Sequence, residues 1–157
     1  MKKYVIISIF TCLLISMISC SQPNSPVLKS AGAEETALFT LAENAINAAL
    51  GPGSYNEIDE KIENNPSNKT HTKTYTYTNY PDGSGGTISG TIIMTGNTET
   101  QKITMTADLK ISGKRLRFSH TSDASKNPAP GTVIDIVFSV DGISYKHQKT
   151  IPNPYRL

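Results

Sequence analysis

The sequence predicts an α+β fold in which an N-terminal helix, or two, packs on one face of a curved antiparallel β-meander of about six strands. Apolar residues recur every three or four positions over residues 34–50, as on one side of a helix. Beyond residue 70 the period changes to two, as in half-buried strands, and glycine-containing turns separate the alternating segments. Only the helix offers a large apolar stripe to cover the sheet.

The predicted helix covers residues 34–50. Glu34 and Glu35 lie in its first turn, where the helix dipole favours negative charge, and Gly51-Pro52-Gly53 ends it. Its apolar stripe consists of Leu38, Leu41, Ala42, Ala45, Ile46 and Ala49.

A second, shorter helix is predicted to follow, so that the helical region extends over residues 34–64. Ser54 and Glu57 have the spacing of a capping box. Tyr55, Ile58 and Ile62 then share one side of about ten residues, a length that is marginal for a helix without tertiary support.

The β-meander is predicted over residues 71–150. The segment QKITMTADLKI, residues 101–111, alternates perfectly between apolar and polar residues, as a half-buried strand does. The six predicted strands are 71–78, 87–95, 101–111, 115–122, 132–140 and 143–150.

Two hairpin turns set the predicted strand register. A turn at Asp141-Gly142 places Val140 opposite Ile143 and Phe138 opposite Tyr145. A turn at Gly113-Lys114 similarly places Ile111 opposite Leu116 and Leu109 opposite Phe118.

Extending this register predicts a row of inward residues that contains two small side chains. Gly90 pairs with Ala107, and Met94 pairs with Ile103. The full row consists of Tyr75, Gly90, Ala107 and His120. It forms either a small ligand pocket or a groove filled by helix residues Ala42, Ala45 and Ala49, and we favour the filled groove because interiors are close-packed.

The opposite sheet face carries a basic patch. The predicted register places Lys110 opposite Arg117, with Arg115 and Lys102 on the same side. Either solvent screens these like charges or an anionic partner, such as a phosphate-bearing glycan or a lipid headgroup, covers them. Alternating threonines from Thr70 to Thr78 fit a sugar-binding face, but β-branched residues on a solvated strand explain them as well.

The first twenty residues have the layout of a secretory signal peptide. Lys2 and Lys3 precede an apolar run from Tyr4 to Ile18, and this run is too short for a comfortable membrane span. It ends at a junction of small residues, Ser19-Cys20.

Residues Ile18-Ser19-Cys20, preceded by Leu14, Ile15 and Met17, resemble the lipobox of bacterial lipoprotein precursors. The resemblance implies cleavage of signal peptide 1–19, a lipid on Cys20, and attachment of the exported protein to a membrane of the cell envelope. Residues 20–33 then form a flexible tether rich in Ser and Pro, followed by one domain, 34–157. Ser21 after the cysteine resembles lipoproteins that are sent to an outer membrane.

Loss of residues 1–19 removes two basic residues and lowers the net charge from +2 to zero, so nucleic-acid binding is not expected. Cys12 is lost as well, which leaves no internal disulfide. The charge is nevertheless polarised, because residues 34–63 carry seven carboxylates against one lysine, whereas residues 69–157 carry eleven basic residues against six acidic ones.

No catalytic or cofactor-binding pattern stands out. No nucleophile, base and orienting group can be assembled, and the DGSGG stretch at 82–86 fits a hairpin loop better than an ion-binding loop. His71, His120 and His147 share the inward parity of their strands but lack metal-site spacing, so no metal is expected. We therefore expect a non-enzymatic binding or structural module of the envelope, contacting an envelope protein or an anionic glycan or lipid, with a carrier of a small apolar ligand between sheet and helix as the alternative.

Overall fold

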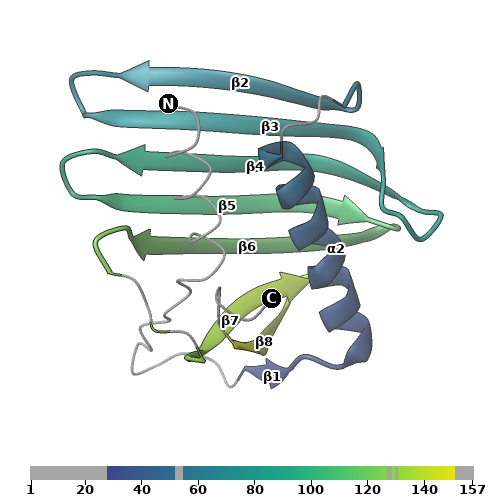
Figure 1. The fold of residues 1–157 in the computed structure, drawn as a ribbon. Helices are drawn as coiled ribbons and strands as arrows, with labels where there is room; N and C mark the ends of the chain where they lie inside the picture. The colour runs from purple at the N-terminus through teal and green to yellow at the C-terminus, as the bar shows by residue number, and fades with distance from the viewer. Residues whose placement is uncertain (1–27, 52–54, 127–128, 130, 151–157) are drawn as a thin grey trace.

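One helix lies across one face of an eight-stranded sheet in the computed structural model of this chain (Figure 1). The structure describes residues 28–51, 55–126, 129 and 131–150. The predicted signal peptide, Cys20 and Ser54 lie outside the described residues. The α+β class is confirmed, although the sheet has eight strands rather than six.

The sheet follows the chain order from β2 to β8, so it is a meander with one short added strand. Its strand order is β1-β8-β7-β6-β5-β4-β3-β2, and all neighbours are antiparallel except β1 and β8. The elements are β1 (Lys29–Ser30), α2 (Ala33–Leu50), β2 (Ile58–Asn65), β3 (Thr70–Pro81), β4 (Thr87–Asn97), β5 (Lys102–Ile111), β6 (Lys114–Asp123), β7 (Val133–Val140) and β8 (Ile143–Thr150).

The six predicted strands correspond to β3 through β8. The predicted register of the last hairpin is also confirmed, because Val140 pairs with Ile143 and Phe138 pairs with Tyr145. Asp141 and Gly142 both have positive φ, 49° and 85°, as a two-residue type I′ turn requires.

The predicted register of the β5–β6 hairpin is wrong by two residues. The turn is Ser112-Gly113, with φ of 50° and 88°, and Leu109 pairs with Leu116 rather than with Phe118. Both central residues adopt the left-handed conformation of a type I′ turn, which places the glycine second. A shift of two leaves every side chain on its predicted face.

The predictions for the two preceding hairpins contain similar shifts. Met94 pairs with Met105 instead of Ile103, because the loop between β4 and β5 occupies residues 98–101. Tyr75 pairs with Ile92, and the β3–β4 ladder is interrupted by a bulge between Tyr77 and Tyr80. Bulges of this kind insert unpaired residues that a regular alternation does not reveal.

The predicted second helix is wrong, because this segment forms strand β2. Ile58 and Ile62 are four residues apart, which puts them on the same side of a helix but also on the same face of a strand. All eight residues of β2 pair with β3, whose backbone groups on that edge need partners. The inter-strand hydrogen bonds stabilise an extended conformation over a marginal helix.

Helix α2 begins and ends close to the predicted positions. The Glu35 carboxylate accepts a hydrogen bond of 3.0 Å from the Gly32 amide at its start, and the Gly51 amide donates to the Asn47 carbonyl at its end. Ion pairs from Glu34 to Lys114 and from Glu43 to Lys149 join the helix to β6 and β8. Both pairs join an acidic residue of the helix to a basic residue of the sheet.

The core lies between α2 and the inner face of the sheet, which is the face that α2 covers (Figure 1). Phe39 of α2 is 1% exposed and contacts the rings of Phe118 on β6 and Phe138 on β7. Within the described part of the chain, two residue pairs join β6 to β7, Leu116 with Val140 and Arg117 with Ser139. Phe39 therefore packs where these two strands diverge.

Two residues of the segment predicted as a tether, residues 20–33, belong to the sheet. Lys29 and Ser30 pair with Tyr145 and Lys146 of β8 in parallel, and the Ala31 amide donates to the Lys146 carbonyl over 2.9 Å. The chain thus joins the domain at the β8 edge of the sheet.

Candidate functional site

An open depression on the outer face, the sheet face opposite α2, is the clearest candidate site. Its volume is about 580 Å³, and we call it the outer depression. Strands β4, β5 and β6 and the β5–β6 turn supply its lining residues, which are Ser89, Gly90, Thr91, Asp108, Lys110, Gly113 and Arg115. Two of these, Lys110 and Arg115, belong to the basic patch that the sequence predicts.

An acidic residue inside the outer depression organises its arginine. Arg115 donates from Nε and Nη2 to the two carboxylate oxygens of Asp108, over 2.8 and 2.6 Å. Arg117 donates from Nε to the same carboxylate over 3.0 Å. Hydrogen bonds from Arg115, and then from Arg117, hold the pKa of the Asp108 carboxyl below its ordinary value.

Lys110 is the unneutralised cation of the outer depression. It is exposed, and its ammonium group forms no hydrogen bond or ion pair with any other residue that the structure describes. The register places it between Ser89 on β4 and Arg115 on β6. The ionised lining side chains are Lys110, Arg115 and Asp108, so the outer depression carries a net charge of +1.

The predicted basic patch is only partly brought together. Lys110 faces Arg115 instead of Arg117, and Arg117 faces Asp108, because the turn lies at Ser112-Gly113. Lys102 is at the other end of β5, opposite Asn97 and Asp123. Lys102 and Lys110 are eight positions apart in the sequence, or about 27 Å along an antiparallel strand. Lys102 therefore does not belong to this site.

The predicted inner row is not formed as one row. Tyr75 and Ala107 share a row with Ile92 and Phe118, whereas Gly90 lies in the next row and His120 pairs with Met105. These displacements follow from the two-residue register shifts in the β3–β4, β4–β5 and β5–β6 hairpins.

The inner face near Gly90 is packed. Tyr77 pairs with Gly90, and its hydroxyl donates to the Ala45 carbonyl of α2 over 2.7 Å. Ala42 and Ala45 are 0% and 1% exposed. Small helix residues thus allow α2 to approach this part of the sheet closely, as expected for a filled groove, and the described residues offer no support here for a carrier cavity.

A polar cluster between β2 and β3 was not predicted. Glu60 accepts hydrogen bonds from Lys73 Nζ over 2.7 Å and from the Tyr75 hydroxyl over 3.1 Å. The hydrogen bond from Lys73 lowers the pKa of the Glu60 carboxyl. Sequence reasoning missed this cluster because it placed Glu60 on a helix, and Lys73 and Glu60 become neighbours only through the β2–β3 ladder.

The DGSGG stretch forms the predicted hairpin loop, closed around a carboxylate. Asp82 is 7% exposed and accepts hydrogen bonds from the Ser84 amide and hydroxyl, the Gly86 amide and the Ser112 hydroxyl. These bonds, led by that from Ser112, lower the pKa of Asp82 to about 2. Its oxygens hold two loops together.

The three histidines lie on separate strands, β3, β6 and β8, and no cluster of metal-binding side chains occurs among the described residues. No described helix is long and apolar enough to cross a membrane. No protein-family model matches the chain, and no significant similarity to a curated protein or to a solved structure was found.

Proposed function

We propose that this protein is a lipid-anchored lipoprotein of the bacterial cell envelope that binds an anionic partner without catalysing a reaction. The signal-peptide layout and the lipobox-like residues that end at Cys20 support the anchor. The observation that carries the binding role is the outer depression, in which Lys110 lacks a counter-ion beside a carboxylate that is already paired.

A short segment between Cys20 and β1 supports an anchor close to the domain. Nine residues separate Cys20 from Lys29, where β1 begins, and nine residues span at most about 30 Å when fully extended. The β1–β8 edge thus stays within that distance of the membrane. A lipid of several acyl chains makes such attachment effectively permanent, since two anchoring signals already suffice for stable binding.

Metabolic labelling with a fatty-acid probe tests the anchor. We expect the wild-type chain to be labelled and the Cys20→Ser variant to remain as a longer, unlabelled precursor, whereas Cys12→Ser should be labelled normally. Wild-type protein without label would overturn the anchor.

Capture of partners from an envelope extract tests the binding role. Lys110 and Arg117 are both replaced by Glu, which reverses two charges at and beside the outer depression. The variant should retain its fold by circular dichroism and lose partner capture in a salt-sensitive way, because exposed charges are screened by salt. Unchanged capture at low salt would remove the outer depression from the proposal.

A further inference from the structure

We infer that the outer depression binds the acidic group of a polysaccharide whose neighbouring sugars lie over the adjoining threonines of the outer face. This inference rests on the proposed binding role and assigns its partner to one chemical class, a glycan with one negative charge per acidic unit. Three features of the outer face carry it.

The first feature is the charge of the outer depression. Among the lining residues, Asp108 neutralises one positive charge through its two hydrogen bonds with Arg115, and Lys110 supplies an unneutralised one. Arg117, which donates to the same carboxylate from beside the outer depression, adds a further positive charge. This excess of positive charge suits an acidic group such as a carboxylate or a phosphodiester. The Asp108 carboxylate also fixes the Arg115 guanidinium in place, so less side-chain entropy is lost on binding.

The second feature is a group of hydroxyls beside the outer depression. Thr76 pairs with Thr91, and Thr106 pairs with Ser119, all on the outer face. We define the hydroxyl patch as Thr74, Thr76, Thr91, Thr106 and Ser119. None of its hydroxyls hydrogen-bonds to another residue within the described part of the chain, unlike Thr72 with Thr95 and Thr104 with Thr121. Each can both donate and accept a hydrogen bond, as sugar hydroxyls require.

The third feature is an apolar side chain within the hydroxyl patch. Ile93 is 39% exposed and lies between Thr74 and Thr106 in the same cross-strand row. It offers a surface for the C–H groups of a sugar ring. Thr106 and Lys110 are four residues apart on β5, or about 14 Å, so a ligand that contacts both is an oligomer rather than a small ion.

A glycan explains these features better than a lipid surface. Anionic headgroups would be attracted to protruding charges, but they have no need of half-buried hydroxyls such as Thr106 and Thr91. Among the described strand residues of the outer face, five acidic ones nearly balance six basic ones, so the long-range attraction to a charged membrane is weak. The acidic residues are Asp59, Glu63, Asp108, Asp123 and Asp135, and the basic ones are Lys61, Lys102, Lys110, Arg115, Arg117 and Lys146.

The test uses the product of the full chain, purified from cells in a neutral detergent, and three probes. The probes are polygalacturonate as an acidic glycan, dextran as a neutral glycan, and dihexanoyl-phosphatidylglycerol as an isolated anionic lipid. We expect polygalacturonate to bind at least about tenfold more tightly than the other two, a difference that corresponds to one well-formed charge-assisted hydrogen bond. Equal binding of the lipid or of dextran would overturn the inference, as would failure to bind polygalacturonate.

Two variants with matched controls locate the binding. Lys110→Gln should weaken polygalacturonate binding about tenfold, whereas Lys102→Gln, the same charge change at the far end of β5, should change it less than twofold. Thr106→Val removes one hydroxyl of the hydroxyl patch and should weaken binding about threefold, with Thr100→Val in the β4–β5 loop as its control. Equal effects of the two lysine changes, or no effect of Thr106→Val, would contradict the inferred site.

Failure of this inference is distinguishable from failure of the proposed function. Labelled protein that captures an envelope partner but not polygalacturonate overturns only the assignment to acidic glycans. Unlabelled protein that still binds polygalacturonate overturns only the lipid anchor.

Discussion

The ring of Phe39 lies against the ring of Phe138 with their centroids 4.9 Å apart, and this contact joins α2 to β7. Phe39 also meets Phe118 edge-on, with the ring centroids 5.8 Å apart. Phe118 belongs to β6 and Phe138 to β7, two strands whose described residues form two pairs. Packing of this helix side chain therefore holds β6 and β7 together where few strand pairs join them.

Replacing Phe39 by Ala should lower the free energy of unfolding by about 3–5 kcal/mol, because it leaves a large cavity in contact with both strands. Phe39→Leu retains most of the volume and should cost less. Urea denaturation of the three proteins measures the difference. A loss below about 1 kcal/mol for Phe39→Ala would show that the junction of β6 and β7 does not depend on this ring.

Of the two glycines of β4, Gly90 should tolerate a side chain least. Its φ is +129°, and a Cβ atom there would lie 2.2 Å from the Asp108 carbonyl oxygen. Gly90→Ala should therefore destabilise the fold by about 2 kcal/mol or more, since both the backbone conformation and the close approach to β5 oppose a side chain.

Gly96, on the same strand, provides the matched control for Gly90→Ala. The nearest atom to a Cβ atom there is the His71 carbonyl oxygen at 4.0 Å. Gly96→Ala should change the denaturant midpoint little. Equal midpoints for the two variants would contradict the close approach at Gly90.

Asp82 should contribute to the loss of stability in acid. Its folded pKa of about 2 lies below the ordinary value of 3.8, so the carboxylate stabilises the fold above pH 3.8 and this contribution is lost as the pH falls towards 2. Asp82→Asn should be less stable at neutral pH and should lose less stability between pH 3.8 and 2 than the wild type does.

Asp59→Asn is the control for Asp82→Asn, because Asp59 is exposed and accepts no hydrogen bond from another described residue. It should change the free energy of unfolding little, because it removes no hydrogen bond between described residues. Thermal unfolding across this pH range gives both profiles. If the stability of Asp82→Asn falls with pH as steeply as that of the wild type, the Asp82 carboxylate does not hold the two loops together.

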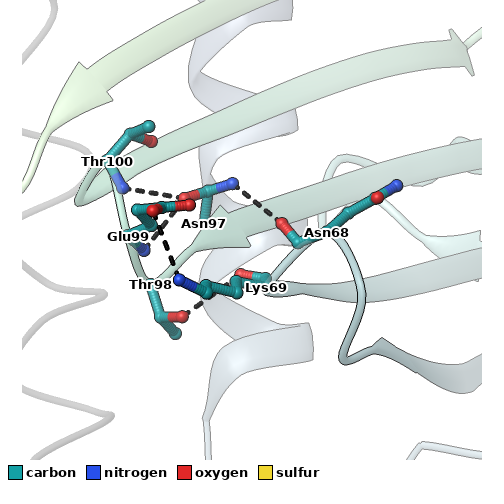
Figure 2. A network of polar contacts seen from close by, with 6 residues as sticks. All are labelled: Asn68, Lys69, Asn97, Thr98, Glu99 and Thr100. Carbon is teal, nitrogen blue, oxygen red and sulfur yellow. Dashed lines mark hydrogen bonds and ion pairs between the residues drawn. The ribbon is translucent and has the colours of Figure 1, made fainter.

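Asn97 should stabilise the β2–β3 and β4–β5 loops, because its side chain forms hydrogen bonds with residues of both (Figure 2). Its side chain accepts hydrogen bonds from the Glu99 and Thr100 amides and donates to the Asn68 carbonyl. Asn97→Ala should lower the free energy of unfolding by about 1–2 kcal/mol, the effect of losing three exposed hydrogen bonds.

The neighbouring ion pair tests whether the two loops are stabilised mainly by the hydrogen bonds of Asn97 or by charge. Lys69 Nζ lies 3.2 Å from Glu99 Oε1, and both side chains are more than half exposed. Lys69→Gln should cost less than about 0.5 kcal/mol, since exposed ion pairs contribute little. A larger loss than that of Asn97→Ala would reverse this assignment.

For the candidate site, the local sequence predicted which residues lie on the outer face but not which of them pair. The alternation in residues 101–111 placed Asp108 and Lys110 on the outer face, and the same parity placed Arg115 and Arg117 there. Which cation remained unpaired depended on a register that shifted by two residues at Ser112-Gly113. Alternation has a period of two, so it determines the face of a residue but not its partner.

The sequence by itself determined the helix at 34–50, the six strands β3 to β8 and the last hairpin, because their periodicity and turn residues are local properties. Only the tertiary structure decided that the segment from Ile58 to Asn65 is extended, since the open edge of β3 supplies its hydrogen bonds. It also decided that β6 and β7 diverge around Phe39, which is a matter of packing between segments far apart in the chain. Long-range contacts of this kind leave no periodic signal in the residues that make them.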